Sequence, residues 1–210
     1  IGILIAGVTQ GSRLVAQMRL ASARALTQSS PVNSITDLVV WLETTSEKSL
    51  DEVDQEDGVA VDNWYDINPQ SSTKINFKQT TAGNRPTYGS TVINGLPAIQ
   101  FNSTNSQYLN SSVTQKYQDV TAADQMTIFA VSRVSGDSNT FFISITSNDS
   151  IRISSHFPIN GSQIILDFGT CCVDTSTRLT TAGGALPSSN LNRPNIVVWQ
   201  KKPALGIIRL

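Results

Sequence analysis

The first thirty residues have the spacing of apolar positions that is typical of an amphipathic helix. Residues 1–8 read IGILIAGV, an apolar run without charge. From residue 9 to residue 29 apolar residues recur every three or four positions, with Arg13, Arg19 and Arg24 between them. That period predicts a helix, and its small residues would let it pack closely on another helix. Pro31 predicts where the helix ends.

From Ile35 onward the helical period gives way to short β-branched segments joined by Gly, Asn and Pro, which favours an all-β domain. Asn94-Gly95 predicts a turn, and residues 44–57 predict an acidic loop. A spacing of about ten residues between strands is typical of a sandwich or jelly roll. The segments expected to build this domain over 31–210 are 35–43 (a buried first strand), 64–67, 74–79, 93–101, 107–109, 126–134 (the clearest core strand), 140–146, 151–157, 163–169 and 195–201.

Charge and cysteine content exclude some classes of function and leave others open. A formal net charge of −1 over 210 residues argues against a nucleic-acid partner, because no basic stripe exists to replace counterions around phosphate. Cys171 and Cys172 are adjacent and cannot join distant segments. Two thiols are favoured over a strained vicinal disulfide, and the single His156 cannot complete a Cys/His metal site. Cysteine usage therefore leaves the compartment undecided.

Residues 1–31, IGILIAGVTQGSRLVAQMRLASARALTQSSP, resemble the second half of the N-terminal helix of type IV prepilins and type II secretion pseudopilins. In that family a basic leader is cleaved just before a long apolar helix, which holds the subunit in the inner membrane and then packs in the core of a filament. Eight apolar residues are too few to span a bilayer, which needs about 20. We therefore expect a fragment whose membrane segment and cleavage site lie upstream of Ile1. Any membrane-anchor helix with a basic flank is the alternative.

The rest of the chain, over about 35–200, resembles the concanavalin/laminin-G superfamily of jelly rolls. The matching residues are DLVVWLE, then Asp57-Gly58 followed by Trp64-Tyr65-Asp66, then INGLPAIQF, QYL and MTIFAVSRV. A complete domain of this type would have further strands after Trp199. The last residues, KPALGIIRL, do not read as a strand, so we expect a frameshift or truncation there, with unpaired sheet edges that promote aggregation.

Glu52-Val53-Asp54-Gln55-Glu56 is the strongest enzymatic candidate. On a strand its three carboxylates would point the same way, and jelly-roll glycoside hydrolases of the concanavalin-like type use a similar Glu-x-Asp-x-Glu strand. Against this, Gln55 replaces an apolar residue, the flanks are polar, and the segment lies inside the acidic loop. We therefore expect a chain that is not an enzyme.

Two further kinds of site follow from the resemblance to laminin-G-like domains and from the side chains available. Such sandwiches often hold Ca²⁺ at the rim of a sheet through carboxylate and carbonyl oxygens, and the candidates here are Asp57, Asp62 and Asp66. An acidic loop without a ligand is the favoured interpretation, so no cofactor is expected apart from this calcium. Aromatic side chains stack on sugars, and the candidates are Trp64, Tyr65, Tyr88, Tyr108 and Tyr117, although Trp41, Trp64 and Trp199 are more typical of a core.

The combined interpretation is a pilin- or pseudopilin-like, non-catalytic exported subunit. Its partners would be the inner membrane, other pilin-like subunits and a glycan or surface ligand, and its β domain would lie in the periplasm or at the cell surface. The alternatives are a membrane-tethered carbohydrate-binding module that does not polymerise, and a glycoside hydrolase. Anchoring and assembly are assigned, through burial, to Ile1, Ile3, Leu4, Ile5, Val8, Leu14, Val15 and Met18.

Overall fold

The computed structural model describes residues 2–111, 125–135, 141–148, 151–159, 163–169, 178–181, 192–202 and 205–209. The chain divides into two compact units, Ile1–Val113 and Thr114–Leu210. The N-terminal helix is part of the first unit, together with the segment up to residue 113, whereas the sequence predicted a boundary at residue 30. Each unit is described by itself.

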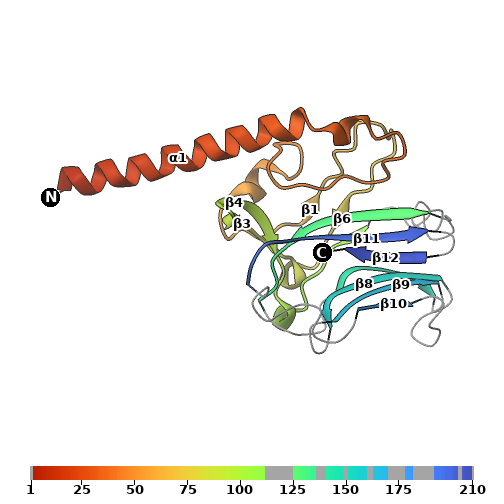
Figure 1. Ribbon diagram of the computed structural model, residues 1–210. Coiled ribbons are helices and arrows are strands. Elements are labelled where there is room, and N and C mark those ends of the chain that lie inside the picture. The colour runs from red at the N-terminus through yellow and green to blue at the C-terminus, as the bar shows by residue number, and fades with distance from the viewer. Residues whose placement is uncertain are drawn as a thin grey trace. The chain divides into compact units, whose positions relative to one another are not determined.

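The first unit contains one long helix, short antiparallel strands and single turns of 3-10 helix among its described residues (Figure 1). Strands β1, β2 and β5 form one sheet, and β3 and β4 form a hairpin. The bounds are α1 Gly2–Gln28, η1 Pro31–Ser34, η2 Glu52–Gln55, β1 Asn63–Trp64, β2 Phe77–Lys78, η3 Ala82–Asn84, β3 Thr87–Ile93, β4 Leu96–Gln100, η4 Ser103–Asn105 and β5 Asn110–Ser111.

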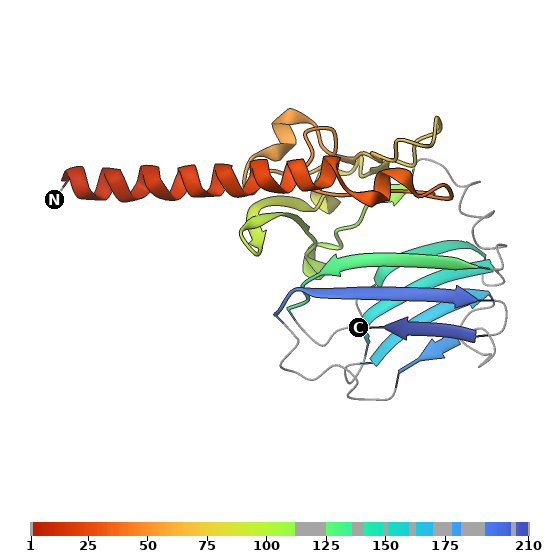
Figure 2. The same cartoon turned by 45° about the horizontal axis from the view of Figure 1, so that its top comes forward.

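The predicted helix is confirmed as α1, and it ends as the sequence indicates. Pro31 begins the 3-10 turn η1, where its missing N–H leaves no hydrogen bond unmade. The Ser30 side chain caps that turn by accepting a hydrogen bond of 3.3 Å from the Val32 N–H. Both views show α1 as one straight helix whose N-terminal part extends beyond the other elements of its unit (Figures 1 and 2).

The predicted turn at Asn94-Gly95 is also confirmed. Asn94 and Gly95 have φ angles of 53° and 75°, and Ile93 pairs directly with Leu96. A two-residue turn with positive φ at both positions matches the right-handed twist of a hairpin, and Asn-Gly adopts it with little strain. Around it β3 and β4 extend over Thr87–Ile93 and Leu96–Gln100; β4 lies within the predicted segment 93–101, whereas β3 was not predicted from the sequence.

The predicted buried strand over 35–43 is wrong. None of these residues belongs to a strand, and Ile35 is 45% exposed. The backbone of this segment makes isolated hydrogen bonds in place of a strand ladder. The Trp41 N–H donates to the Asp66 carboxylate at 2.9 Å, and the Trp41 carbonyl accepts from the Ile67 N–H at 3.0 Å. Residues 107–109 form no strand either, and 64–67 and 74–79 contribute only the two-residue strands β1 and β2.

The second unit is built from antiparallel strands in its described part, arranged as a four-stranded sheet β10-β9-β8-β7 and a three-stranded sheet β12-β11-β6. Strands that overlap the predictions at 126–134, 140–146, 151–157, 163–169 and 195–201 are all present. The bounds are β6 Met126–Ser132, β7 Phe141–Asn148, β8 Ile151–Ile159, β9 Gln163–Gly169, β10 Arg178–Thr180, β11 Asn195–Lys202 and β12 Leu205–Arg209.

The C-terminal residues correct a second prediction. KPALGIIRL was not expected to contain a strand, yet β12 covers Leu205–Arg209 and pairs with β11, with Trp199 opposite Ile208. The local pattern is a poor strand signal because it alternates weakly. The backbone N–H and carbonyl groups at the edge of β11 allow residues 205–209 to pair as a strand despite this weak signal.

Both sheets of the second unit contribute to one core. Its buried side chains are Ala130, Phe157, Ile164, Leu166, Val197 and Trp199, and the expectation that Trp199 lies in a core is confirmed. Strand β6, expected to be the clearest core strand, buries only Ala130, while Phe129 is 71% exposed. A buried carboxylate, Asp167, is held by Arg178 through two hydrogen bonds, one of 2.8 Å from Nη2.

We predict that Gly89→Ala destabilises the hairpin. A Cβ at this buried position in β3 would lie 2.2 Å from Cγ2 of Val92 and 2.5 Å from Oε1 of Gln100. Such overpacking costs about 1–3 kcal/mol. Gly83→Ala is the matched control, because nothing lies within 4 Å of its added Cβ. Urea unfolding of both variants measures the difference, and equal midpoints would contradict the packing argument.

Candidate functional site

The side of α1 that packs on its own unit is the less apolar side. The half-buried residues follow a spacing of four, three and four, from Ala16 through Leu20 and Ala23 to Thr27, with Arg24 beside them. Because successive residues of an α-helix are rotated by about 100°, this spacing defines one face. The remainder of the helix is exposed from residue 8 onward.

The opposite face of α1 carries an exposed apolar stripe, which we define as Val8, Leu14, Val15, Met18 and Leu26. These side chains are between 48% and 68% exposed. The stripe covers about 120° of the helix surface, from Leu14 to Leu26, and the centre of that arc lies about 150° around the helix from the packed face. The structure therefore directs the most apolar side of the helix away from the unit to which the helix belongs.

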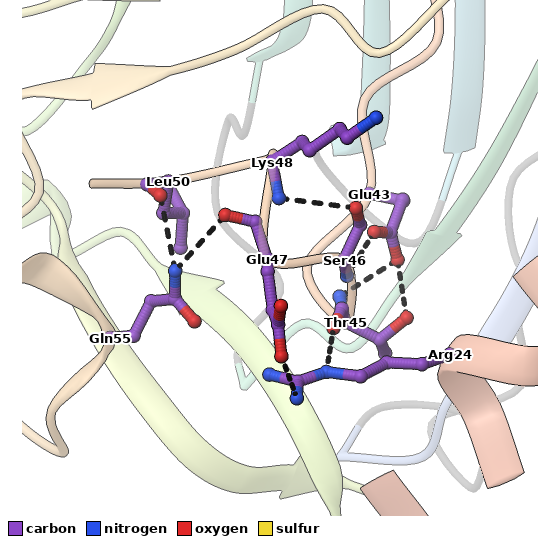
Figure 3. A network of polar contacts seen from close by, with 8 residues as sticks. All are labelled: Arg24, Glu43, Thr45, Ser46, Glu47, Lys48, Leu50 and Gln55. Carbon is purple, nitrogen blue, oxygen red and sulfur yellow. Dashed lines mark hydrogen bonds and ion pairs between the residues drawn. The ribbon is translucent and has the colours of Figure 1, made fainter. Parts of the chain in front are cut away.

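Polar contacts attach the C-terminal half of α1 to its unit (Figure 3). Arg24 pairs with Glu47 at 2.6 Å and donates to the Thr45 carbonyl at 2.8 Å. The loop that carries these acceptors is ordered by Glu43, whose carboxylate accepts hydrogen bonds from the N–H groups of Thr45 and Ser46. The attachment thus depends on charge and hydrogen bonding, and it leaves the stripe uncovered.

A second contact lies nearer the middle of the helix. A Cβ built on Gly95 would be 2.8 Å from Nη1 of Arg19, so the guanidinium lies directly over the Asn94-Gly95 turn. Residues of α1 and β4 are accordingly neighbours. The hairpin and the loop around Glu47 together fix the direction of the helix within this unit.

The residues that the sequence assigned to assembly are distributed as follows. Val8, Leu14, Val15 and Met18 all lie on the exposed stripe. Ile3, Leu4 and Ile5 are part of α1, and Ile1 lies outside the described residues. Leu26 was not among the predicted residues, although its spacing of eleven from Val15 was the available signal.

Within the portion of the chain that the structure describes, no helix has both the length and the apolarity that crossing a membrane requires.

The glycoside hydrolase arrangement predicted for Glu52, Asp54 and Glu56 does not form. Residues 52–55 make the 3-10 turn η2, in which Asp54 is buried while Glu52 and Glu56 are exposed. Residues two apart in a 3-10 helix are rotated by about 240°, so alternate carboxylates do not share a face. The three side chains therefore lack the common orientation that a strand would give them.

Asp54 instead meets two other carboxylates, Asp51 and Asp62, and their oxygens all lie within 4.8 Å of one another. Burial is the largest cause that raises the pKa of Asp54 above 3.8, and the charges of Asp62 and Asp51 raise it further. A backbone hydrogen bond from Asp62 opposes them. Among the described residues, these three carboxylates are close enough to one another to share a cation. Of the three, the sequence had suggested only Asp62 as a calcium ligand.

The other two calcium candidates are engaged elsewhere in the unit. Asp66 is buried and accepts backbone hydrogen bonds from Trp41, Asn68 and Ile75 at 2.9–3.0 Å. Asp57 is exposed and accepts from the N–H and hydroxyl of Ser90, which lowers the pKa of its carboxyl. Asp57, Asp62 and Asp66 therefore do not converge on one position.

The candidate sugar-binding aromatic residues are mostly used within the fold. Tyr88 is buried in the core cluster with Leu50 and Val61, and Trp64 packs against that cluster. Trp64 donates its indole N–H to the Glu43 carbonyl at 2.8 Å, and the Tyr65 hydroxyl donates to Asp51. Tyr108 alone of the four predicted residues that the structure describes is exposed, at 44%.

Four other residues were singled out in the sequence, and the structure describes one of them. Tyr117, Cys171 and Cys172 lie outside the described residues. His156 is buried in β8.

Comparison with known proteins adds no relative: no family model, no curated protein and no solved structure matches the chain.

We predict that Asp66→Asn destabilises the first unit. Asparagine keeps the shape of the side chain but replaces one of the two acceptor oxygens with an NH₂ group. A backbone N–H that donates to Asp66 in the natural chain would then face another donor and lose its hydrogen bond. An unsatisfied buried donor costs about 1–3 kcal/mol. Asp57→Asn is the control, since Ser90 uses only one oxygen of that carboxylate and the site is exposed. Urea unfolding of both variants should show a clearly lower midpoint for Asp66→Asn alone.

Asp54→Asn should stabilise the protein near neutral pH. Because the folded state raises the pKa of Asp54 above 3.8, its ionisation removes stability as the pH rises through the raised value. The variant should therefore melt higher than the natural chain at about pH 7, and the difference should disappear below 3.8. Melts run in EGTA measure this directly. Repeating them with Ca²⁺ tests whether Asp51, Asp54 and Asp62 hold a cation, because a cation site there would stabilise the natural chain more than the variant.

Proposed function

We propose that this chain is a non-catalytic, pilin- or pseudopilin-like exported subunit that assembles with other copies through the exposed apolar stripe of α1. Anchoring at the bacterial inner membrane and presentation of the β domain in the periplasm or at the cell surface are parts of the same proposal. The β domain would act as an adhesive or ligand-binding module of the concanavalin/laminin-G-like jelly-roll type.

The observation that carries the proposal is the orientation of α1. A helix that served only to stabilise its own unit would turn its apolar side inward, since burying a Leu, Val or Met side chain contributes about 1.5–3 kcal/mol. Here the apolar side points outward and a mixed side packs. Single exposed apolar residues are ordinary, but a continuous stripe is typical of an interaction surface.

The stripe also has the shape that close helix packing needs. Gly11, Ser22 and Ala25 lie among its apolar residues, on the same side of the helix and exposed. A Cβ added to Gly11 would meet nothing within 4 Å, so the surface there is open. Small residues between larger apolar ones let two helices approach closely, which supports association of copies through α1.

The second unit supports the β-domain part of the proposal. Its described strands form two antiparallel sheets that share one buried core, which agrees with a sandwich. The exposed Tyr108 in the first unit is a residue available for a ligand. The absence of a shared face for Glu52, Asp54 and Glu56 favours binding over hydrolysis.

Val15→Asp in the full natural gene product tests the role of the stripe. A charge at this position would be buried in the assembled form, so the yield of sheared surface filaments should fall by about tenfold or more. Val131→Asp is the matched control, because it makes the same change at a 60% exposed valine on strand β6 of the second unit. A normal yield of filaments from the Val15→Asp variant would contradict the proposal that α1 lies in the interface between copies. Recovery of the natural protein from membranes only would favour the tethered module, and glycan cleavage abolished by Glu52→Gln would favour the hydrolase.

A further inference from the structure

Two arginines of α1 occupy the same side of the helix at different heights. Arg13 and Arg24 are eleven residues apart, which is about three turns, or about 16 Å along the axis. Arg24 is half-buried and paired with Glu47 of its own unit at 2.6 Å. Arg13 is exposed and makes no ion pair with any residue that the structure describes. Arg13 thus lies on the same side of the helix as Arg24 but has no described carboxylate to pair with.

The surroundings of Arg13 are polar and open. With Gln10, Leu14 and Gln17 it lines a shallow hollow on the helix surface. Among the described side chains of α1, Ala16 is the first that is half-buried, so Arg13 lies just before the part of the helix that packs on its unit. Leu14 belongs to the apolar stripe, so the hollow borders the surface that the proposed function assigns to assembly.

The charges of the first unit are separated along the chain. Helix α1 contains Arg13, Arg19 and Arg24 and no acidic residue. Acidic residues are concentrated instead in residues 43–62, where Lys48 is the single basic residue. They are Glu43, Glu47, Asp51, Glu52, Asp54, Glu56, Asp57 and Asp62.

Two of these acidic side chains have carboxylates without a hydrogen bond or ion pair among the residues that the structure describes. Glu52 and Glu56, at and beside η2, are exposed and form no ion pair with a described residue. Glu43, by contrast, orders its own loop, and Glu47 holds Arg24. A basic group brought from outside would therefore meet Glu52 and Glu56 without displacing a contact within the unit.

We propose that Arg13 of one copy of this chain binds Glu52 and Glu56 of a second copy. The inference rests on the proposed function, and it names a contact that the apolar stripe alone does not define. The occupant is a second copy because the same chain carries both an unpaired arginine on a projecting helix and the complementary carboxylates.

The contact joins two different surfaces and is therefore heterologous. Heterologous contacts produce rings when the rotation closes and open filaments when it does not. The stripe supplies attraction without direction, because apolar burial is roughly proportional to area. The ion pairs would fix the axial offset between neighbouring copies, since they form only when the Arg13 turn of one copy lies beside η2 of the next.

The test uses two differently tagged full chains, mixed and recovered through one tag at low and high salt. Arg13→Glu should weaken recovery of the second chain by about two- to fivefold at low salt, the range of an exposed ion pair. Chains with Glu52→Lys and Glu56→Lys should show the same loss. Mixing Arg13→Glu chains with Glu52→Lys/Glu56→Lys chains should restore recovery, because the opposite charges face each other again. Arg193→Glu, an equal charge change at an exposed site of the second unit, is the control.

The outcomes separate this contact from the proposed function. If the natural chains associate and Arg13→Glu behaves like Arg193→Glu, the contact is wrong while assembly through the stripe stands. Failure of the mixed charge-reversed pair to recover also overturns the contact. If the natural chains do not associate at any salt concentration, assembly itself is wrong and this contact with it. Circular dichroism of each variant verifies that α1 is retained.

Discussion

The first unit depends on carboxylates that accept backbone N–H groups. Asp66 is buried and binds the N–H groups of Trp41, Asn68 and Ile75, which belong to three separate stretches of chain. A buried N–H must find an acceptor, and most proteins supply one through strand pairing. Here the strands outside the hairpin are two residues long, so side chains provide acceptors that a longer sheet would have provided.

This constraint explains why Asp57 and Asp66, which look like metal ligands in the sequence, are engaged by groups of their own unit instead. Asp57 gains hydrogen bonds from Ser90, and its carboxyl pKa falls. Asp54 is buried beside two other carboxylates, and its pKa rises. The first arrangement favours the ionised carboxylate and the second opposes it, so one acidic loop contains groups with opposite responses to pH.

The same reliance on polar contacts determines what α1 can do. Arg24 fastens the helix to the Glu47 loop, and Arg19 lies over the hairpin turn; neither contact needs the apolar residues of the helix. Those residues remain exposed as a stripe. A helix fastened through its apolar side would have no such surface left. The polar attachment therefore leaves the stripe uncovered, which the proposed assembly requires.

Local periodicity and turn chemistry were enough to predict α1 and its end at Pro31, the Asn94-Gly95 turn, and most of the described strands after residue 125. They could not show that residues 35–43 are not a strand, because an apolar run does not reveal whether a backbone N–H will meet a strand or the Asp66 carboxylate. The tertiary structure decided this, and it also decided that 205–209 pair with β11. The direction of the apolar stripe likewise depends on contacts distant in sequence, since periodicity defines the face of a helix but not which face its own domain covers.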